Sequence, residues 1–344
     1  MHYTAPTQPC QGDNYTIEPG EVLRDESRSG RTVPWIRQKQ LSTTLAAALY
    51  VVDAAAAARM EHCADRLSFR RDWGDPDKPG RLKLAQAYFC RVRVCPMCQW
   101  RRSLKAGGQL RQCIEYLKHQ RESNGKKPYR YILLTLTVPN VPGPDLAACL
   151  DTIQGAWHRL VRRKEYRAAI KGSVRCVEIT YNRRRADYHP HIHALLAVNP
   201  SYFDDSRIYI ERDKWLDMWR DCTGISSITQ VDIRKTTGDG AAVAEVVKYA
   251  TKAGDYLNVY DVDATAEVLD TLLNACYKRK FIGWGGVLRD AHRALNLDDV
   301  DDGDLVHTGY DDEGESNAAA ALWHWDFYVG PRLYLSSGVT MARD

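Results

Sequence analysis

The most regular alternation of hydrophobic and polar positions lies in the middle of the chain. Residues 131–138 form an apolar run, broken only by threonines, that predicts a buried strand. The Pro- and Gly-rich segment 139–144 ends this strand. Asp145 is then placed to cap a helix that continues to about Ile170. The pattern therefore changes from period two to helical within a few residues.

Further elements follow in the same region. We predict, in order, strand 173–181, turn 182–187, strand 188–198, helix 215–221, strand 228–233 and a helix after Gly240. The order strand, helix, strand, strand, helix, strand, helix is typical of a split βαβ arrangement, which closes into an antiparallel sheet with helices on one side. We therefore expect an α+β fold with strand 188–198 near the centre of its sheet.

Helical patterns flank this region. Residues 36–66 are Ala-rich and predict one long helix or two short ones, and a second helix is predicted over 101–121. Residues 1–36, rich in Pro, Gly, Ser and charge, predict a poorly ordered tail. A helix over 265–280 precedes an acidic linker and the aromatic segment 323–334, which we expect to pack against the body.

Length and composition limit the class of protein. A chain of 344 residues with 44% hydrophobic positions can bury a substantial core. The N-terminus lacks a basic region followed by an apolar one, and the most apolar stretch, 45–58, is short and contains Asp53. We therefore expect a soluble, cytoplasmic protein with no membrane partner. Ten cysteines without an export signal favour reduced thiols and a metal site over disulfides.

Charge is distributed unevenly along the chain. The net charge is only +4, but basic residues form clusters, while acidic residues concentrate at 298–304 and 311–315. A single basic cluster is more often a solvated face than a binding site. Several clusters near candidate chemistry favour a path for nucleic acid. The residues that we expect to contact DNA are Arg101, Arg102, Lys105, Arg183, Arg184 and Arg185.

Three histidines share one face of strand 188–198. Side chains alternate between the two faces of a strand, so His189, His191 and His193 point the same way. A lone histidine is more often a core residue with satisfied ring nitrogens. Imidazoles at this spacing instead predict ligands of one metal ion, and hard oxygen ligands beside them favour Mg²⁺ or Mn²⁺ acting on phosphate.

The β-hairpin suggests a carboxylate ligand for the same metal. If its turn is centred between Arg184 and Arg185, Glu178 lies directly opposite His191 and can reach the histidine face. A slip of one residue in register would turn this carboxylate to the other face of the sheet.

Four polar side chains lie at helical spacing further along the chain. Glu245, Lys248, Tyr249 and Lys252 would share one helix face. Such a tyrosine is more often a core residue, but a phenol beside two ammonium groups and a metal can act as a nucleophile on phosphate. Glu245, one turn before the tyrosine, could position or deprotonate a water molecule. The group predicts phosphodiester chemistry through a covalent tyrosine intermediate.

Cysteines mark a second metal site upstream. Cys90, Cys95 and Cys98 have metal-ligand spacing, and thiolates favour zinc. Cys63 is the best fourth ligand because it lies upstream in the same predicted unit, and the adjacent His62 is the alternative. The alternative interpretation is that these cysteines are unconnected buried thiols that bind no metal. We expect a structural zinc site.

With these motifs in place, the chain resembles the rolling-circle plasmid replication initiators, a family of metal-dependent HUH endonucleases with a His-hydrophobic-His motif and one catalytic tyrosine. The resemblance covers roughly residues 63–304. It rests on three motifs in the order of the family, at 134–140 (Leu-Thr-Leu-Thr-Val-Pro-Asn), 189–193 (His-Pro-His-Ile-His) and 245–252 (Glu-Val-Val-Lys-Tyr-Ala-Thr-Lys). Residues 89–98 also look like the cysteine motif of the family.

The resemblance implies an activity and partners. It implies nicking of single-stranded DNA in an origin hairpin, with Tyr249 retaining the 5′ end as a phosphotyrosine and the free 3′ hydroxyl priming synthesis. Glu245 near Tyr249 resembles members of the family that end the cycle with a carboxylate-activated water. Host helicase and polymerase are the protein partners that this activity implies.

These observations divide the chain into a tail (1–36), a helical zinc-binding unit that contacts DNA (37–128), an HUH-type nuclease domain (129–260) and a C-terminal extension with an acidic linker (261–344). Three alternatives remain open. A transposase would use the same chemistry on other DNA ends. A non-catalytic zinc-containing nucleic-acid-binding protein would form no covalent adduct, and a metallohydrolase of small phosphoesters would not need Tyr249.

Overall fold

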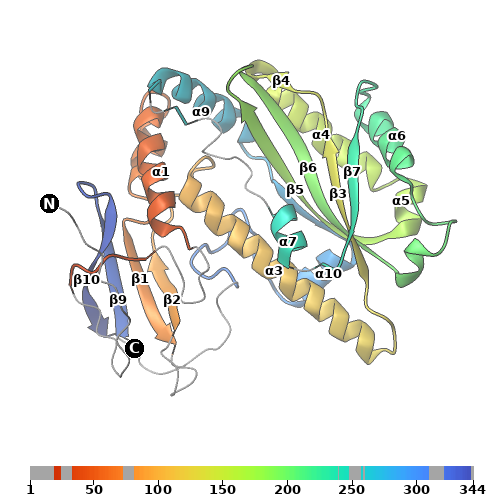
Figure 1. Cartoon of the computed structure of the whole chain (residues 1–344), viewed down its shortest axis with the longest axis horizontal. Coiled ribbons are helices and arrows are strands. Elements are labelled where there is room, and N and C mark those ends of the chain that lie inside the picture. The colour runs from red at the N-terminus through yellow and green to blue at the C-terminus, as the bar shows by residue number, and fades with distance from the viewer. Residues whose placement is uncertain are drawn as a thin grey trace.

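The computed structural model contains two antiparallel sheets connected by a long helix (Figure 1). It describes residues 19–24, 33–72, 81–238, 240–247, 257–258, 260–309 and 321–341. The α+β fold class is therefore confirmed. None of the helices in these ranges is both long enough and apolar enough to cross a membrane.

The larger sheet has the strand order β7-β3-β6-β5-β8, and each neighbouring pair is antiparallel. Its strands are β3 (Arg130–Thr137), β5 (Ile170–Asn182), β6 (Asp187–Val198), β7 (Val231–Thr236) and β8 (Ile282–Gly285), and the short β4 (Val141–Pro142) pairs with β6 outside this order. Strand β6, which carries the three histidines, is the middle strand, as predicted.

Helices cover both faces of the larger sheet, so the expectation of helices on one side was wrong (Figure 1). One face packs against α4 (Leu146–Leu160), α5 (Lys164–Ala169) and α6 (Arg212–Thr223), and the other packs against α3 (Pro96–Ser123), α7 (Gly240–Val246) and α10 (Gly286–Ala294). The physical reason is that β6 is apolar on both faces: Ile192 packs on the α4 side, and Leu195 on the α3 side.

Two of these helices differ from the sequence prediction. The helix predicted from Asp145 to about Ile170 is broken into α4 and α5, and the side chain of Asp145 makes no capping hydrogen bond. Two 3₁₀ turns complete this region, η1 (Gly143–Asp145) and η2 (Pro200–Phe203). Helix α9 (Val262–Cys276) lies between α4 and the N-terminal unit.

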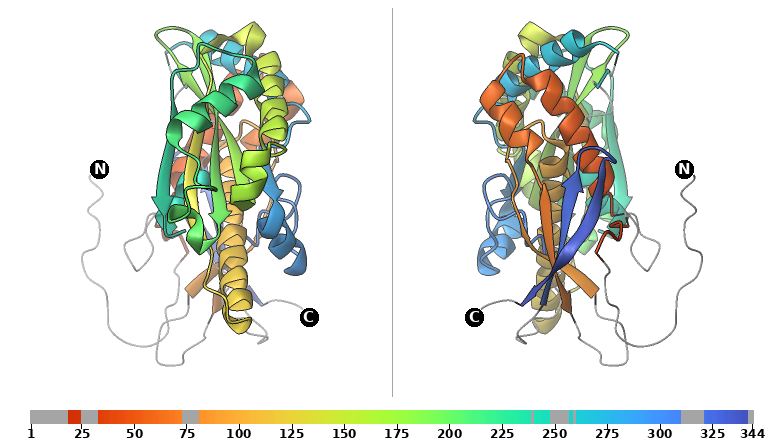
Figure 2. Two further views of the ribbon diagram at one scale, coloured as in Figure 1. Left: turned by 90° about the vertical axis from the view of Figure 1, so that its right-hand side faces the viewer. Right: turned by 90° about the vertical axis from the view of Figure 1, so that its left-hand side faces the viewer.

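The smaller sheet has the strand order β10-β9-β1-β2 and combines two strands from the N-terminal part of the chain with two from the C-terminal part (Figure 2). It contains β1 (Arg66–Asp72), β2 (Arg81–Ala87), β9 (Ala321–Tyr328) and β10 (Leu333–Met341), with α1 (Trp35–Leu49) and α2 (Ala54–Glu61) beside it. The two helices confirm the second of the two options for residues 36–66. The unit was predicted to be helical, but it also contains strands β1 and β2. Strand β1 pairs with β9, whose residues lie more than 250 positions away in the sequence.

The predicted divisions of the chain are crossed by strand pairing. From the predicted C-terminal extension, β9 and β10 join the smaller sheet, and β8 joins the larger one. Within the predicted tail, the amide of Leu23 donates to the carbonyl of Tyr334, and Leu23 is buried. Residues 20–23 are therefore part of the fold, whereas 1–18 and 25–32 lie outside the described residues.

Helix α3 connects the two sheets. Its 28 residues span about 42 Å. Near its N-terminus, Trp100 packs edge-to-face on Trp35 of α1, with ring centroids 4.7 Å apart. Its middle part packs against α7 and α10 on the larger sheet. The helix therefore fixes the cysteine-rich unit relative to the histidine strand.

Candidate metal centres and nucleic-acid contacts

The strongest candidate site is formed by two strands of the larger sheet. Glu178 on β5 pairs directly with His191 on β6, which is the predicted register. Oε2 of Glu178 lies 2.9 Å from Nε2 of His191 and 2.9 Å from Nε2 of His193. The side chain of Glu178 is 1% exposed, and both imidazoles are buried. Three ligand atoms therefore converge on one point.

Backbone and side-chain contacts orient the two imidazoles. Nδ1 of His191 donates to the carbonyl of His189 at 3.1 Å, and Nδ1 of His193 lies 3.2 Å from Oγ1 of Thr135. These contacts hold Nε2 of each ring toward Glu178, and the carbonyl of His189 selects the tautomer of His191 whose Nε2 can bind a metal. Sequence reasoning missed Thr135, although its position in an alternating strand places it on the histidine face.

His189 lies beside this group without joining it. Its ring centroid is 5.3 Å from that of His191, but its ring nitrogens are not among the converging ligand atoms of Glu178, His191 and His193. Burial, with the neighbouring His191, lowers the pKa of His189, which favours a neutral ring. The predicted role of His189 as a metal ligand is therefore not supported by its position.

Glu245 reaches the same site from α7. Its Oε1 lies 4.0 Å from Nδ1 of His193, and its side chain is 43% exposed. The turn before α7 depends on Gly238, which has φ +77° and packs so closely on Tyr131 that a Cβ would lie 2.7 Å from Cδ2 of that ring. The other predicted members of this motif, Lys248, Tyr249 and Lys252, lie outside the described residues.

The donor set fits a divalent cation. A carboxylate buried to this extent is costly unless a cation or a proton neutralises its charge. Two imidazole nitrogens and one carboxylate oxygen, with Glu245 nearby, are ligands that Mn²⁺ accepts readily and that leave room for a phosphate oxygen. Glu178, His191 and His193 are the residues that would hold the ion.

Four cysteines form a second group of converging ligands. Sγ atoms of Cys63, Cys90, Cys95 and Cys98 all lie within 4.8 Å of one another, and all four residues are buried. Burial raises the pKa of the Cys63 thiol well above its usual range, so four thiolates at this place require a cation. The set fits structural zinc.

The geometry distinguishes the two candidates for the fourth ligand. Cys63 lies in the group, with its Sγ 3.6 Å from that of Cys98, whereas the exposed ring of His62 contacts Asp65. The amide of Arg91 donates to Sγ of Cys98 at 3.3 Å, as expected of a turn that wraps a metal-bound thiolate. On α1, the buried Lys39 donates to the carbonyl of Cys63 at 3.0 Å.

Comparison with known proteins connects these sites to a family. A family model described as "Replication protein" matches residues 81–332, which include three of the four cysteines and the whole of the histidine strand. This chain belongs to that Rep family of replication proteins. The predicted resemblance to plasmid replication initiators is thereby confirmed.

Individual relatives agree with this membership. "Protein rep" of Streptococcus pneumoniae is 34% identical and aligns over 89% of this chain and 93% of its own length. "Protein rep" of Bacillus amyloliquefaciens is 33% identical over 88% of this chain and 95% of its own length. "Protein rep" of Staphylococcus aureus reaches 41% identity over 58% of this chain and 82% of its own length. No solved structure gave a significant match.

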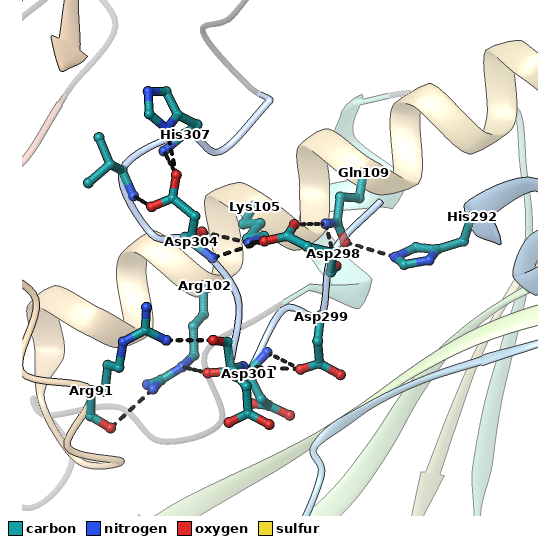
Figure 3. Close-up of polar contacts among 12 residues, drawn as sticks. Arg91, Arg102, Lys105, Gln109, His292, Asp298, Asp299, Asp301, Asp304 and His307 are labelled. Carbon is teal, nitrogen blue, oxygen red and sulfur yellow. Dashed lines mark hydrogen bonds and ion pairs between the residues drawn. The ribbon is translucent and has the colours of Figure 1, made fainter. Parts of the chain in front are cut away.

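Three basic residues of α3 have a different role in this Rep family member from the one predicted. They bind residues 298–306, which we call the acidic segment, and Figure 3 shows this for Arg102 and Lys105. The ammonium of Lys105 binds the carboxylate of Asp298 and donates to the carbonyl of Asp304 at 2.6 Å. Arg101 donates to the carbonyls of Leu305 and Val306.

Arg102 is held in the same way. It donates to the carbonyls of Asp301 and Arg91, and its side chain is buried like those of Arg101 and Lys105. Burial and these hydrogen bonds do not support the prediction that the three cations contact DNA, because the acidic segment of the same chain already binds them. Their hydrogen bonds fasten residues 298–306 to α3.

The basic turn between β5 and β6 remains accessible. Arg183, Arg184 and Arg185 are exposed. Arg185 forms an ion pair of 2.7 Å with Asp187, and Arg183 donates to the carbonyl of Leu257. The predicted DNA contacts of this turn are compatible with its exposure and stay a prediction.

Proposed function

We propose that this chain is a site-specific, single-strand DNA endonuclease and strand transferase that initiates and terminates rolling-circle replication of a plasmid. The observation that carries the proposal is the convergence of Glu178, His191 and His193, with Glu245 beside them, in a member of a replication protein family. Its DNA substrate is a single-stranded site in an origin hairpin, and its HUH-type nuclease fold is centred on the larger sheet.

The metal site prepares the phosphate for attack. When bound, Mn²⁺ or Mg²⁺ supplies Lewis acidity to the non-bridging oxygens of the scissile phosphate. Glu178 and the two imidazoles hold the ion, while Thr135 and the carbonyl of His189 fix the rings that bind it. Because this face of the sheet is covered by α3, α7 and α10, the ligands are held in place before DNA arrives.

Tyr249 is the nucleophile in the proposed reaction. Its phenol oxygen forms a bond to phosphorus, and the bond between phosphorus and the 3′ oxygen breaks. The phenol proton passes to solvent, and the leaving oxygen takes up a proton to become the 3′ hydroxyl that primes synthesis. Lys248 and Lys252 stabilise the phenolate, whose ordinary pKa is near 10.

Glu245 acts when the cycle ends. It accepts a proton from a water molecule whose oxygen attacks phosphorus, and the bond from phosphorus to the tyrosine oxygen breaks. The strand leaves with a 5′ phosphate, and the tyrosine oxygen takes up a proton from solvent to regenerate the phenol. In strand joining, a 3′ hydroxyl takes the place of water. The half-exposed position of Glu245, 4.0 Å from His193, supports this role because it borders both the metal site and solvent.

The remaining parts of the chain support these steps. The four cysteines hold a structural zinc, and the exposed turn 183–185 contacts the DNA backbone. Host helicase and polymerase would use the nicked strand in the cytoplasm.

A covalent adduct tests the proposal. Purified protein is incubated with Mn²⁺ and a pool of single-stranded oligonucleotides that includes the origin, and the products are separated by denaturing electrophoresis and mapped by peptide mass. We expect DNA attached to Tyr249, and no adduct from a Tyr249→Phe variant that still binds DNA. Binding without any adduct from the intact protein would favour the non-catalytic reading, and adducts on transposon ends alone would favour a transposase.

A further inference from the structure

A basic pocket lies at one end of the larger sheet, near the lower ends of β3 and β7 in Figure 1. It has a volume of about 520 Å³ and is lined by Tyr129, Arg130, Lys235, Thr236 and Thr237. Pockets of this size hold small ligands or single nucleotides. No motif from the sequence and no part of the proposed chemistry accounts for it.

Two cations at this pocket share one aromatic ring. The guanidinium carbon of Arg130 lies 4.6 Å from the centroid of Phe203, and Nζ of Lys235 lies 5.1 Å from the same centroid. Neither cation forms an ion pair with a carboxylate in the described part of the chain. Two like charges on one ring, with no ion-pair partner among the described residues, raise the local positive potential and favour binding of an anion.

Aromatic and basic groups continue along the rim. The guanidinium carbon of Arg121 lies 4.1 Å from the centroid of Tyr129, and its Nε donates to the carbonyl of Lys127 at 2.6 Å. Lys126 and Lys127 are exposed, and Tyr129 is half-buried. Cations beside an accessible aromatic ring are the combination that binds the phosphates and bases of unpaired nucleic acid.

The pocket is connected to the candidate metal site by short stretches of chain. Along β3, Arg130 is five residues from Thr135, the neighbour of His193, which corresponds to about 16 Å. Thr236 and Thr237 of the pocket lead into α7, which carries Glu245. The basic turn 183–185 lies at the opposite end of β6, so the metal site is between two basic regions.

We propose that this pocket binds a nucleotide of single-stranded DNA at a distance from the phosphate that is cleaved, with Arg130 and Lys235 contacting the backbone and Tyr129 contacting a base. A single strand fits better than a duplex because only unpaired bases can enter a pocket and meet an aromatic ring. The location relative to the nick rests on the proposed function, whereas the binding itself does not.

The test measures binding of a fluorescein-labelled thymidine homopolymer to the full-length protein by anisotropy, over a range of salt concentrations and without added divalent ions. The variants are Arg130→Gln, Lys235→Gln and the double variant, and Arg59→Gln is the control because Arg59 is an exposed arginine on α2. We expect the slope of log affinity against log salt to fall by about 0.7 for each phosphate that a variant no longer neutralises. Tyr129→Leu should weaken binding by about fivefold or more.

Three results would refute DNA binding at this pocket. The double variant could keep the wild-type affinity and salt slope, Arg59→Gln could lose as much affinity as the pocket variants, or the pocket variants could lose affinity only for duplex probes. Lys235 is exposed, so its single variant tests the charge without risk to folding. Adduct formation on origin DNA is measured separately. A wild-type protein that forms no adduct but shows the expected salt slopes would refute the nuclease and leave the pocket standing.

Discussion

Oε2 of Glu178 lies 2.9 Å from Nε2 of His191, its direct partner across the β5–β6 hairpin. The same oxygen is equally close to Nε2 of His193. One buried carboxylate thus bridges two imidazoles whose other nitrogens are already engaged. This relationship makes the metal site the most testable part of the molecule.

Glu178→Gln should weaken Mn²⁺ binding by at least about 100-fold. An amide carries no charge, and loss of a direct metal ligand lowers metal affinity more than loss of a residue that only hydrogen-bonds to a ligand. Isothermal titration of the metal-free site with Mn²⁺ measures the change. The substitution preserves shape, so the thermal unfolding midpoint of the metal-free protein should change little. Unchanged Mn²⁺ affinity would remove Glu178 from the ligand set.

Thr135→Val is the matched test of a group that supports a ligand. It removes the hydroxyl 3.2 Å from Nδ1 of His193 and keeps the side-chain volume. We expect Mn²⁺ affinity to fall by about 10- to 100-fold, less than for Glu178→Gln, because the ring loses its orientation but remains a ligand. An effect equal to that of Glu178→Gln would mean that Thr135 does more than orient the ring.

Glu245→Ala should separate nicking from release. Its carboxylate lies at the edge of the site, 4.0 Å from His193, and is not one of the three converging ligands. We expect adduct formation to continue while the adduct lifetime rises by about 100-fold or more, as for loss of a general base. The lifetime is followed by quenched gel electrophoresis. A normal lifetime would assign release to another group.

Cys63→Ser should lower the zinc content and the unfolding temperature together. Four thiolates would close the proposed structural zinc site, and metal binding of this kind contributes directly to folding free energy. Metal analysis and calorimetry measure the two quantities. Cys149→Ser is a matched control because Cys149 lies on α4, outside the group. Full zinc content in Cys63→Ser would return the fourth position to His62.

Lys105→Met tests the structural role of the α3 cations. The buried ammonium binds Asp298 and the carbonyl of Asp304, so its loss should destabilise the protein by about 1–3 kcal/mol. The measurement is denaturant unfolding. Because Lys105 is 1% exposed, the salt dependence of DNA binding should not change. A reduced salt slope with unchanged stability would instead show that Lys105 binds a phosphate.

The sequence by itself determined the parts of the site that depend on local geometry. Alternation along one strand placed His191 and His193 on one face, and the length of a tight turn fixed Glu178 opposite His191. The spacing of three cysteines likewise brought their thiols together. Each of these follows from the repeat of a strand or a short loop, which a sequence carries directly.

Only the tertiary structure decided which distant groups meet. Strands β1 and β9 pair across more than 250 residues, and no local pattern encodes such a partner. The basic side chains of α3 could face DNA or an acidic segment, since charge in a sequence does not state its counter-charge. Folding brought Asp298 to Lys105 and left Arg130 and Lys235 together on Phe203, because packing of the sheets chooses among partners that the sequence leaves equivalent.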